Sequence, residues 1–472
     1  MQNNDFLIEI IIFYWKIITS RKMLKTILFI AIPIFIYSIL LNFVTEQKDL
    51  FLITIVLSTI IFWATSIVPS FYSSLLFLFS CTAFSLSSKE LIFSGFASSA
   101  FWLVLAGMLI ATAIKNANLT HRFSKIFSNL KNVSYLNIII SITIFSTLFS
   151  FVMPSSVGRV VLMVPLSIAV AKSFGFNEND KGYIGILLAF ILTTSMSGFA
   201  ILPANVPNMI LTGLSAQIYN YEILYSHYLI TNFLIFGILK DIMIVILIFN
   251  FFKDTPKVIN KNKTKVKFSK NEIIVLFTIS IMIVLWATDF IHKIAPSIIA
   301  ICGILFLALP SIGIIKSEDI NSIKFSSLLF VATIIGLGTV VAHNDYIKDI
   351  LSNLIGVYEP SQYAVLNYIK VTLVMSLTGM FATQPSIPAI FTPMAEQIGN
   401  ATGFTLEQIL MMQVAAYSNI FFSYQAPPLI VGLTLAKIKQ KYVLKILLTL
   451  ALLTIVFLYP LQYFWIEFLK AF

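Results

Sequence analysis

The chain has 472 residues, of which 58% are hydrophobic and 11% charged, and it carries a formal net charge of +11 with a mean hydropathy of +0.94. A soluble protein of this length cannot bury so much apolar surface, so we expect most of the chain to lie in a lipid bilayer. The excess of lysine falls in short segments between apolar runs, as in the cytoplasmic loops of membrane proteins, and therefore does not indicate a nucleic-acid partner. Cys81 and Cys302 share no motif, and we predict no disulfide, metal site or cofactor.

The first 22 residues carry Asp5, Glu9 and Lys16 and lack a cleavage site of small residues, so we predict a retained cytoplasmic helix over 1–22. Apolar runs of the length that a bilayer requires then alternate with shorter ones along the chain. In chain order we predict membrane spans over 23–115, a first hairpin and broken helix over 135–215, a span over 226–252, a basic linker or arm helix over 253–271, spans over 272–342, a second hairpin and broken helix over 366–436, and a last span over 446–468.

Two apolar segments are interrupted by proline, glycine and polar residues at corresponding places in the two halves of the chain. They are Phe151–Val160 and Phe381–Ile390, and each is followed by a second break, at 203–208 and at 424–428 respectively. The apolar runs beside these breaks are too short to cross a bilayer alone, namely 205–215, 387–398 and 426–436. Because lipid tolerates unwound backbone only where protein or a water-filled cavity covers it, we expect the four breaks to converge on one substrate site, with Ser155 and Thr383 facing the same pocket.

The placement of basic residues agrees with this arrangement. If each hairpin enters and leaves the membrane on one side, every basic cluster falls on the same face, which the positive-inside rule makes the cytoplasmic one. These clusters are Arg21 to Lys25, Arg122 to Lys131, Lys172 and Lys181, Lys253 to Lys270, Lys316 and Lys324, and Lys437 to Lys445. The resulting order predicts an all-α polytopic membrane protein with an inverted-topology repeat, about eleven spans, two re-entrant hairpins and two broken helices, which is typical of secondary transporters with alternating access.

At the four breaks, and over most of its length, the chain resembles the divalent-anion/sodium symporter family of dicarboxylate, citrate and sulfate carriers, within the wider ion-transporter superfamily. The segment Gly95–Gly107 is similar to the family's fourth span, and Leu285–Asp289 to its seventh. The first tip, Pro154–Arg159, is most similar to the Pro-Ser-Asn-Thr-Ala-Arg form of the citrate/succinate and oxoglutarate/malate exchanger branch. The resemblance implies a homodimer whose scaffold spans hold a transport domain, made of 135–215 and 366–436, that moves as an elevator.

In that family a Ser-Asn-Thr tripeptide at each tip binds substrate carboxylates and helps to hold sodium. Here the first hydroxyl remains as Ser155 and Thr383, but the third is replaced by Val157 and Pro385, which removes oxygen ligands that sodium needs. Helices broken in mid-membrane also turn free N–H groups toward the gap, which favours an anion. We assign substrate binding to Ser155, Ser156, Arg159, Asn208, Thr383, Gln384, Ser386 and Pro427. We assign a coupling sodium ion, for which a proton is the alternative, to Ser155, Ser156, Asn205, Thr383 and Gln425.

Three ionisable residues lie at depths where a charge is costly. Arg159, one helical turn past Ser155, can pair with the substrate or replace a missing cation, and it can equally be a snorkelling residue or half of a structural ion pair. Lys240 and Asp241 fall near the centre of the 226–252 run, where a structural role and a proton-coupling role for Asp241 both remain open. Since neighbours in sequence do not face each other on a helix, each is expected to have a partner elsewhere.

These observations predict a secondary active transporter rather than an enzyme, since the sequence contains no nucleotide-binding loop and no hydrolase motif. The expected substrate is a di- or tricarboxylate, taken up with sodium or exchanged for another anion. Sulfate or another oxyanion is the alternative within this class, a cation/proton antiporter is the next alternative, and an intramembrane enzyme and a channel are the least supported. The expected location is a bacterial inner membrane, with the N-terminus in the cytoplasm.

Overall fold

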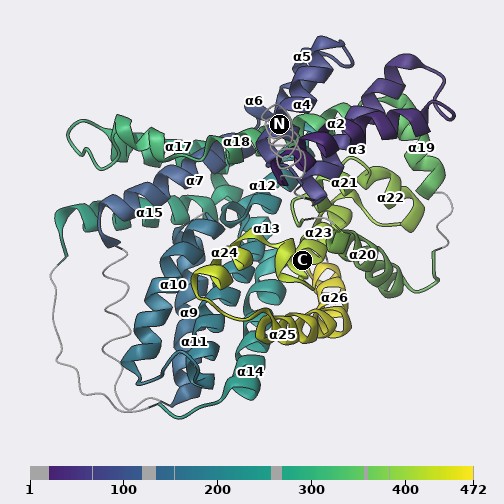
Figure 1. Ribbon diagram of the computed structural model, residues 1–472. Helices are drawn as coiled ribbons and strands as arrows, with labels where there is room; N and C mark the ends of the chain where they lie inside the picture. Colours follow the sequence, from purple (N-terminus) through teal and green to yellow (C-terminus); the bar gives the residue numbers. More distant parts are fainter. Residues whose placement is uncertain are drawn as a thin grey trace, which may run out of the picture.

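The computed structural model describes residues 21–65, 67–119, 134–153, 155–256, 268–355, 360–381 and 383–470. Within these ranges the chain consists of helices and the turns that connect them, with no strand (Figure 1). Three predictions fall wholly or mostly outside the described residues: the helix over 1–22, the basic segment Arg122 to Lys131, and the centre of the linker over 253–271.

Eleven helices of the described chain are long and apolar enough to cross a bilayer. They are Met23–Leu40, Gln47–Thr65, Ser99–Asn116, Tyr135–Val152, Ser156–Ser173, Lys181–Ala200, Tyr225–Phe252, Lys270–Ala287, Phe325–Ala342, Ala364–Phe381 and Gln440–Lys470. This set contains three arms of the predicted hairpins and omits the shorter apolar helices Ser70–Ala83 and Pro296–Ala308, so it is not the same set as the predicted spans. The prediction of an all-α polytopic membrane protein is confirmed.

The two halves of the chain repeat one series of helices. The first half contains α3 (Gln47–Thr65), α4 (Ser70–Ala83) and α7 (Ser99–Asn116), followed by a helical hairpin of α9 (Tyr135–Val152) and α10 (Ser156–Ser173) and a broken helix of α11 (Lys181–Met196) and α12 (Val206–Tyr219). The second half contains α15 (Lys270–Ala287), α17 (Pro296–Ala308) and α18 (Phe325–Ala342), followed by a hairpin of α20 (Ala364–Phe381) with α21 (Ser386–Phe391) and α22 (Ala395–Thr402), and a broken helix of α23 (Leu406–Ser418) and α24 (Pro427–Leu435).

Each half ends in a long helix with a π-helical stretch at its centre. In the first half, α13 (Tyr225–Asn232) continues through the π-helical Phe233–Leu239 into α14 (Lys240–Phe252). In the second half, α25 (Gln440–Leu453) continues through the π-helical Thr454–Leu458 into α26 (Tyr459–Lys470). Among the described residues, the remaining helices of four residues or more are α2 (Arg21–Leu40), α5 (Lys89–Ile92), α6 (Ser94–Ala97), α16 (Asp289–His292), α19 (Asp345–Ile355) and the 3₁₀ turns Ser197–Ala200 and Ser317–Ser322. π-helical turns are rare in proteins. Their occurrence at equivalent positions in the two halves therefore supports the internal repeat.

The two hairpins pack reciprocally on the broken helices of the other half. The second arm of the first hairpin, α10, packs against α24, and the second arm of the other hairpin, α21, packs against α12. Figure 1 shows α24 beside α10, next to the near-parallel bundle of α9, α11 and α14. As a result of these reciprocal contacts, both hairpin tips lie in the same region as both helix breaks.

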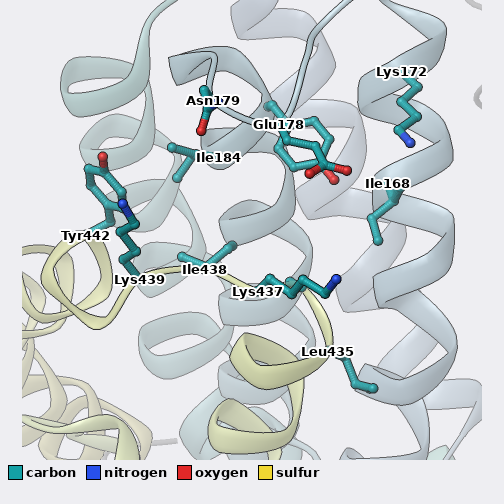
Figure 2. Close-up of a pocket in the computed structure, with 12 residues that line it drawn as sticks. Ile168, Lys172, Glu178, Asn179, Ile184, Leu435, Lys437, Ile438, Lys439 and Tyr442 are labelled. Atoms are coloured by element: carbon teal, nitrogen blue, oxygen red, sulfur yellow. The ribbon is translucent and has the colours of Figure 1, made fainter.

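Lysines from two distant parts of the chain surround a cavity of about 340 Å³, here called the lysine cavity. Figure 2 shows Lys172 of α10 together with Lys437 and Lys439, which lie between α24 and α25, and the single carboxylate of Glu178 near them. Two of the predicted basic clusters therefore lie at the same end of the molecule, as the charge pattern requires. That this end faces the cytoplasm stays a prediction.

The backbones of α6 and α18 approach so closely that only glycine fits between them. A Cβ on Gly95 would lie 1.9 Å from the backbone oxygen of Ala332, which cannot move without shifting α18. A Cβ on Gly303 would instead meet the flexible side chain of Met282, at 2.4 Å from Sδ. We expect Gly95→Ala to destabilise the protein by about 1–3 kcal/mol and Gly303→Ala by less. Thermal unfolding of the two purified variants compares them, and a Gly95→Ala protein as stable as Gly303→Ala would contradict this close approach.

Candidate functional site

Both hairpin tips and both helix breaks line one cavity of about 390 Å³, here called the tip cavity. The first half contributes Ser156, Val157, Asn205, Val206 and Pro207, and the second half contributes Thr383, Gln384, Pro385, Pro427 and Pro428. The rest of the wall comes from helices α2, α3 and α18, from the turn before α4 and from the first residue of α4, through Lys25, Phe62, Trp63, Val68, Pro69, Ser70, Ser327 and Phe330. The four breaks, which are far apart in the sequence, therefore lie together around one cavity in the fold.

Two helices of the first half begin at the tip cavity. Ser155 is the N-cap of α10, and its Oγ accepts a hydrogen bond of 3.2 Å from the backbone N–H of Gly158. Asn205 is the N-cap of α12, and its Oδ1 accepts from the N–H of Val206 at 3.0 Å. The first turns of these helices have more N–H groups than their caps can satisfy, and both helix dipoles point their positive ends at the cavity. This part of the wall favours an anion.

Arg159 lies behind the first tip, fully buried, and does not line the tip cavity. Its Nη1 donates to the backbone oxygens of Met153 at 2.6 Å and of Ala204 at 3.0 Å, and its Nη2 donates to that of Thr194 at 3.2 Å. These carbonyls belong to the end of α9, to the first helix break and to α11. No ion pair in the described part of the chain includes this guanidinium. It ties the first tip to the first break through backbone oxygens.

The amides of Asn208 and Gln425 also face the protein interior. Asn208 donates from Nδ2 to the backbone oxygens of Gly198 at 3.0 Å and of Ile201 at 2.8 Å. Gln425 donates from Nε2 to the oxygen of Gly379 at 2.7 Å, and its Oε1 accepts from two backbone N–H groups of its own loop. Each amide thereby holds a break in shape, and neither lines the tip cavity.

The second tip is held by its own backbone and by Gln384. The Nε2 of Gln384 donates to the oxygen of Tyr417 at 2.8 Å, at the end of α23, while its backbone N–H donates to the oxygen of Gln425 at 3.1 Å. Ser386 is buried beside the tip, and its N–H donates to the oxygen of Thr383 at 3.0 Å. Of the predicted site residues, the tip cavity is lined by Ser156, Asn205, Thr383, Gln384 and Pro427, and not by Ser155, Arg159, Asn208, Ser386, Gln425 or Asp241.

Ser155 lines a neighbouring cavity of about 450 Å³, here called the flanking cavity. The two cavities share a wall made of Ser156, Val157, Asn205, Val206 and Ser327. The flanking cavity continues to Lys115 and Lys324, which add positive charge at its far side, with Asp319 beside them. Ser155 and Thr383 therefore lie on adjacent cavities rather than on one.

Lys240 and Asp241 occupy the centre of the 225–252 helix, as predicted, and point to different partners. The Nζ of Lys240 donates to the backbone oxygen of Ser418 at 2.5 Å, where α23 ends at the second break. The carboxylate of Asp241 accepts hydrogen bonds from Thr147 of α9 and from Ser197 at the first break. One short stretch of helix thus contacts the breaks of both halves.

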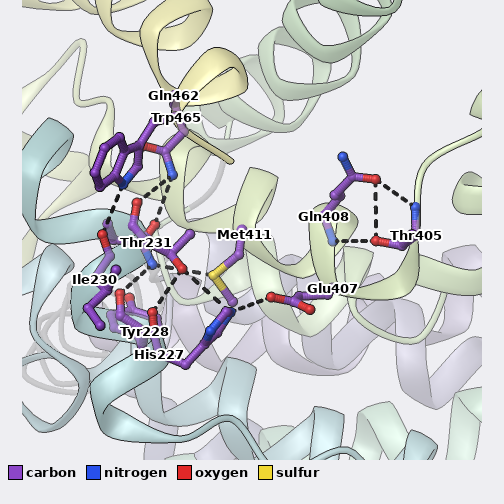
Figure 3. A network of polar contacts seen from close by, with 11 residues as sticks. His227, Tyr228, Ile230, Thr231, Thr405, Glu407, Gln408, Met411, Gln462 and Trp465 are labelled. Atoms are coloured by element: carbon purple, nitrogen blue, oxygen red, sulfur yellow. Dashed lines mark hydrogen bonds and ion pairs between the residues drawn. The ribbon is translucent and has the colours of Figure 1, made fainter. Parts of the chain in front are cut away.

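A second polar network, which the sequence did not indicate, joins α13, α23 and α26. His227 forms an ion pair with Glu407, and the Nε2 of Gln462 donates to the backbone oxygen of Thr231 at 3.0 Å (Figure 3). Trp465 donates from Nε1 to the oxygen of Ile230 at 3.0 Å. These contacts fasten the terminal helices of the two halves to each other, away from the tip cavity.

Comparison with known proteins gives three findings. Residues 20–471 match the family described as the sodium:sulfate symporter transmembrane region. The sodium-dependent dicarboxylate transporter SdcS of Staphylococcus aureus (strain USA300) is 24% identical over 193 aligned positions, and the match covers 39% of this chain and only 37% of that relative. The crystal structure of the Alcanivorax borkumensis YdaH transporter, described as having an unusual topology, superposes with a TM-score of 0.53 at 14% identity, over 80% of this chain and 88% of that chain. This last likeness shows the fold alone.

Proposed function

Because the chain belongs to the family of the sodium:sulfate symporter transmembrane region, we propose that it is a secondary active carrier whose substrate is a di- or tricarboxylate. Membership makes it a multi-pass membrane transporter of anions and not an enzyme. The match to the dicarboxylate transporter covers little more than a third of that relative, and the support for the substrate class comes from the tip cavity.

The observation that carries the proposal is the tip cavity itself. Its volume of about 390 Å³ suits a small organic anion and is within the range of ligand pockets. Two helix N-termini and neutral donors line it, and Lys25 of α2 adds one cation. Neutral donors bind an anion without holding it as a fixed cationic site would, which suits a carrier that must release its cargo.

The polar groups that the hairpin tips and helix breaks bring to the tip cavity come in two sets, one from each half of the chain. Ser156 and Asn205 form the first set, and Thr383 and Gln384 form the second. A molecule with a carboxylate at each end can bond both sets at once, whereas a compact ion such as sulfate meets them less well. Sulfate or another oxyanion remains the alternative within the class.

Two coupling modes are proposed, sodium symport and anion exchange. Both the family description and the name of the relative mention sodium. In this chain, however, Val157 and Pro385 bring no hydroxyl to the tip cavity, and Arg159 occupies the backbone oxygens of Met153 at the end of α9 and of Ala204 at the first break, which leaves them less available to a sodium ion. These features favour exchange, or a coupling ion other than sodium at the first tip.

We also propose that the hairpins and broken helices form a transport domain that moves as an elevator within a homodimer. The reciprocal contacts of α10 with α24 and of α12 with α21 support this proposal, because a domain that moves as a rigid body must be joined within itself, although α12 also packs on α7 and α18. The scaffold would consist of α2 to α7, the span predicted over 226–252, and α15 to α18. The homodimer, the re-entrant nature of the hairpins, the bacterial inner membrane and the cytoplasmic N-terminus follow from the resemblance and the charge pattern.

Thermal stability of the purified protein against anions tests the function. Succinate, citrate and sulfate are each added in sodium and in choline, because a ligand of the native state raises the melting temperature by mass action. We expect one anion to raise it, and Ser156→Ala and Thr383→Ala each to weaken that anion's binding about 10-fold, the loss of one hydrogen bond to a charged group.

Ser386→Ala is the matched control, because Ser386 is a buried hydroxyl of the second tip that lies off the tip cavity. It should bind the anion as the unaltered protein does. If no anion raises the melting temperature, but sodium or a change of pH does so alone, the cation/proton antiporter replaces the anion carrier.

A further inference from the structure

The carboxylate of Asp241 lies in a buried cluster of hydroxyl groups. Ser197 donates to its two oxygens at 3.1 Å, Thr147 donates to Oδ2, and the two hydroxyl oxygens are 3.3 Å apart. The side chain is almost completely buried, and no ion pair of the described residues reaches it. An ionisable group at this depth of a membrane protein is energetically costly, and such groups usually have a function.

We propose that Asp241 binds and releases a proton during transport and so couples proton movement to the anion. This inference rests on the proposed anion-carrier function, which it deepens. The proton enters from one side of the membrane, forms the carboxylic acid at Asp241 while the anion is bound, and leaves to the other side as the carboxylate re-forms.

The hydroxyls around Asp241 can satisfy both protonation states. The Oγ1 of Thr147 also lies 2.9 Å from the backbone oxygen of Thr143, and the Oγ of Ser197 lies 2.8 Å from that of Thr193. When Asp241 is ionised, both hydroxyls donate to it. When it is protonated, its own O–H donates to one hydroxyl, which turns to its backbone oxygen, while the other hydroxyl still donates to the remaining carboxyl oxygen. Because neither state leaves a buried polar group unmet, the change between them is cheap.

A stripe of hydroxyls runs along α9 through this cluster, and Ser150 extends it toward the first hairpin tip. Thr143, Ser146, Thr147 and Ser150 are buried at intervals of three and four residues on one face of α9. The hydroxyls of Thr143 and Ser146 have no hydrogen-bond partner within the described chain. The stripe ends close to Met153, whose side chain lines the flanking cavity. Through these polar groups, the proton on Asp241 can exchange with solvent.

Two cations explain how the proton and the anion are linked. Lys240 is the neighbour of Asp241 on its own helix, and Arg159 of α10 lies next to Ser197, since its Nη2 would be 2.3 Å from a Cβ on Gly198. While Asp241 is ionised, it offsets one of these two charges. Once it is protonated, both cations act unopposed near the tips, which favours a bound anion. By linkage, a bound anion equally favours the protonated carboxyl.

Other titratable groups of the surrounding elements are directed elsewhere. From α13, Tyr228 donates its hydroxyl to the backbone oxygen of Phe199. From α9, Tyr135 donates to the oxygen of Gly182, and from α25, Lys445 lies over the ring of Phe251 at the far end of α14. Asp241, Thr147 and Ser197 line none of the three cavities described above, and a proton, unlike a sodium ion with its shell of oxygen ligands, needs no such space.

Binding and transport of succinate by the full-length protein test the proposal. Between about pH 6.5 and about pH 8.5 both carboxyls of succinate are ionised, so a change in affinity reports on the protein. We expect succinate to bind about 10-fold more tightly at the lower pH, and in proteoliposomes we expect its uptake to carry protons inward, read by an internal pH dye. Asp241→Asn, which mimics the protonated state, should bind succinate with an affinity that no longer depends on pH and should move no protons.

His227→Gln is the control, because the His227–Glu407 pair is another titratable group on the same long helix (Figure 3). It should keep the pH dependence. Thr147→Val tests the same proposal if Asp241→Asn does not fold. It removes a hydrogen-bond donor to the ionised carboxylate of Asp241. We therefore expect the midpoint of the pH dependence of succinate binding to move upward by about one unit. Succinate binding that is independent of pH in the unaltered protein, or proton movement that survives Asp241→Asn, would overturn the coupling alone. Absence of binding by any anion would overturn the anion-carrier function as well.

Discussion

Replacing Arg159 by methionine should destabilise the protein by about 3–5 kcal/mol, the cost of leaving buried partners of a charged group unpaired. The guanidinium bonds the backbone oxygens of Met153, Ala204 and Thr194, which belong to three different elements. Methionine fills much of the stem's volume but offers no donor, so these oxygens lose their partner in the interior. The melting temperature of the purified variant measures the effect.

Lys172→Met is the matched control, since Lys172 is an exposed cation near the end of the same helix, α10. It should change stability by no more than about 0.5 kcal/mol, as surface substitutions usually do. Arg159→Lys should fall between the two, because one ammonium group keeps the charge but cannot span three oxygens. An Arg159→Met protein that melts like the unaltered protein but no longer binds the anion would instead make the guanidinium a direct partner of the substrate.

The breaks at the tips could be predicted because proline marks them. Proline lacks an N–H group and clashes with the preceding turn, so Pro203, Pro207 and Pro427 indicate unwound backbone wherever they cluster with polar residues. Proline alone is an ambiguous signal, however. Pro33 and Pro165 both lie inside continuous helices, α2 and α10. The breaks are identified because the pattern of proline clustered with polar residues occurs in both halves of the chain.

The roles of individual side chains at the tips could not be predicted in the same way. Ser155 and Ser156 are neighbours, but the chain enters α10 between them, and a helix turns each residue by about 100° from the last. Only Ser156 therefore reaches the tip cavity. Arg159, Asn208 and Gln425 bond backbone carbonyls, which every residue possesses, so no sequence pattern reveals such partners.

Contacts between elements that are far apart in the sequence could not be predicted either. The pairing of His227 with Glu407 joins residues 180 positions apart, and that of Asp241 with Thr147 joins residues 94 apart. The sequence indicated only that Asp241 needs a partner away from its own helix. Which helix would supply it depends on how the hairpin and the long helix pack, and that is a property of the assembled fold.

A negative charge placed in the tip cavity should distinguish an anion carrier from a cation carrier. Val157 lines both the tip cavity and the flanking cavity, at the position where the resembling family carries a hydroxyl. In Val157→Asp, a carboxylate about 6 Å from one charge of the anion repels it by about 2.8 kcal/mol at an effective dielectric constant of about 20. This corresponds to binding about 100-fold weaker, measured as the loss of the anion's thermal shift.

Val157→Asn separates charge from shape, because its side chain has nearly the size of aspartate and no charge. We expect it to bind the anion within a few-fold of the unaltered protein. If the cavity binds cations, the order reverses: the aspartate then adds an oxygen ligand and an attractive charge, and sodium should stabilise Val157→Asp more than Val157→Asn. The sign of the difference between these two variants therefore depends on the charge of the cargo, whichever anion or cation it is.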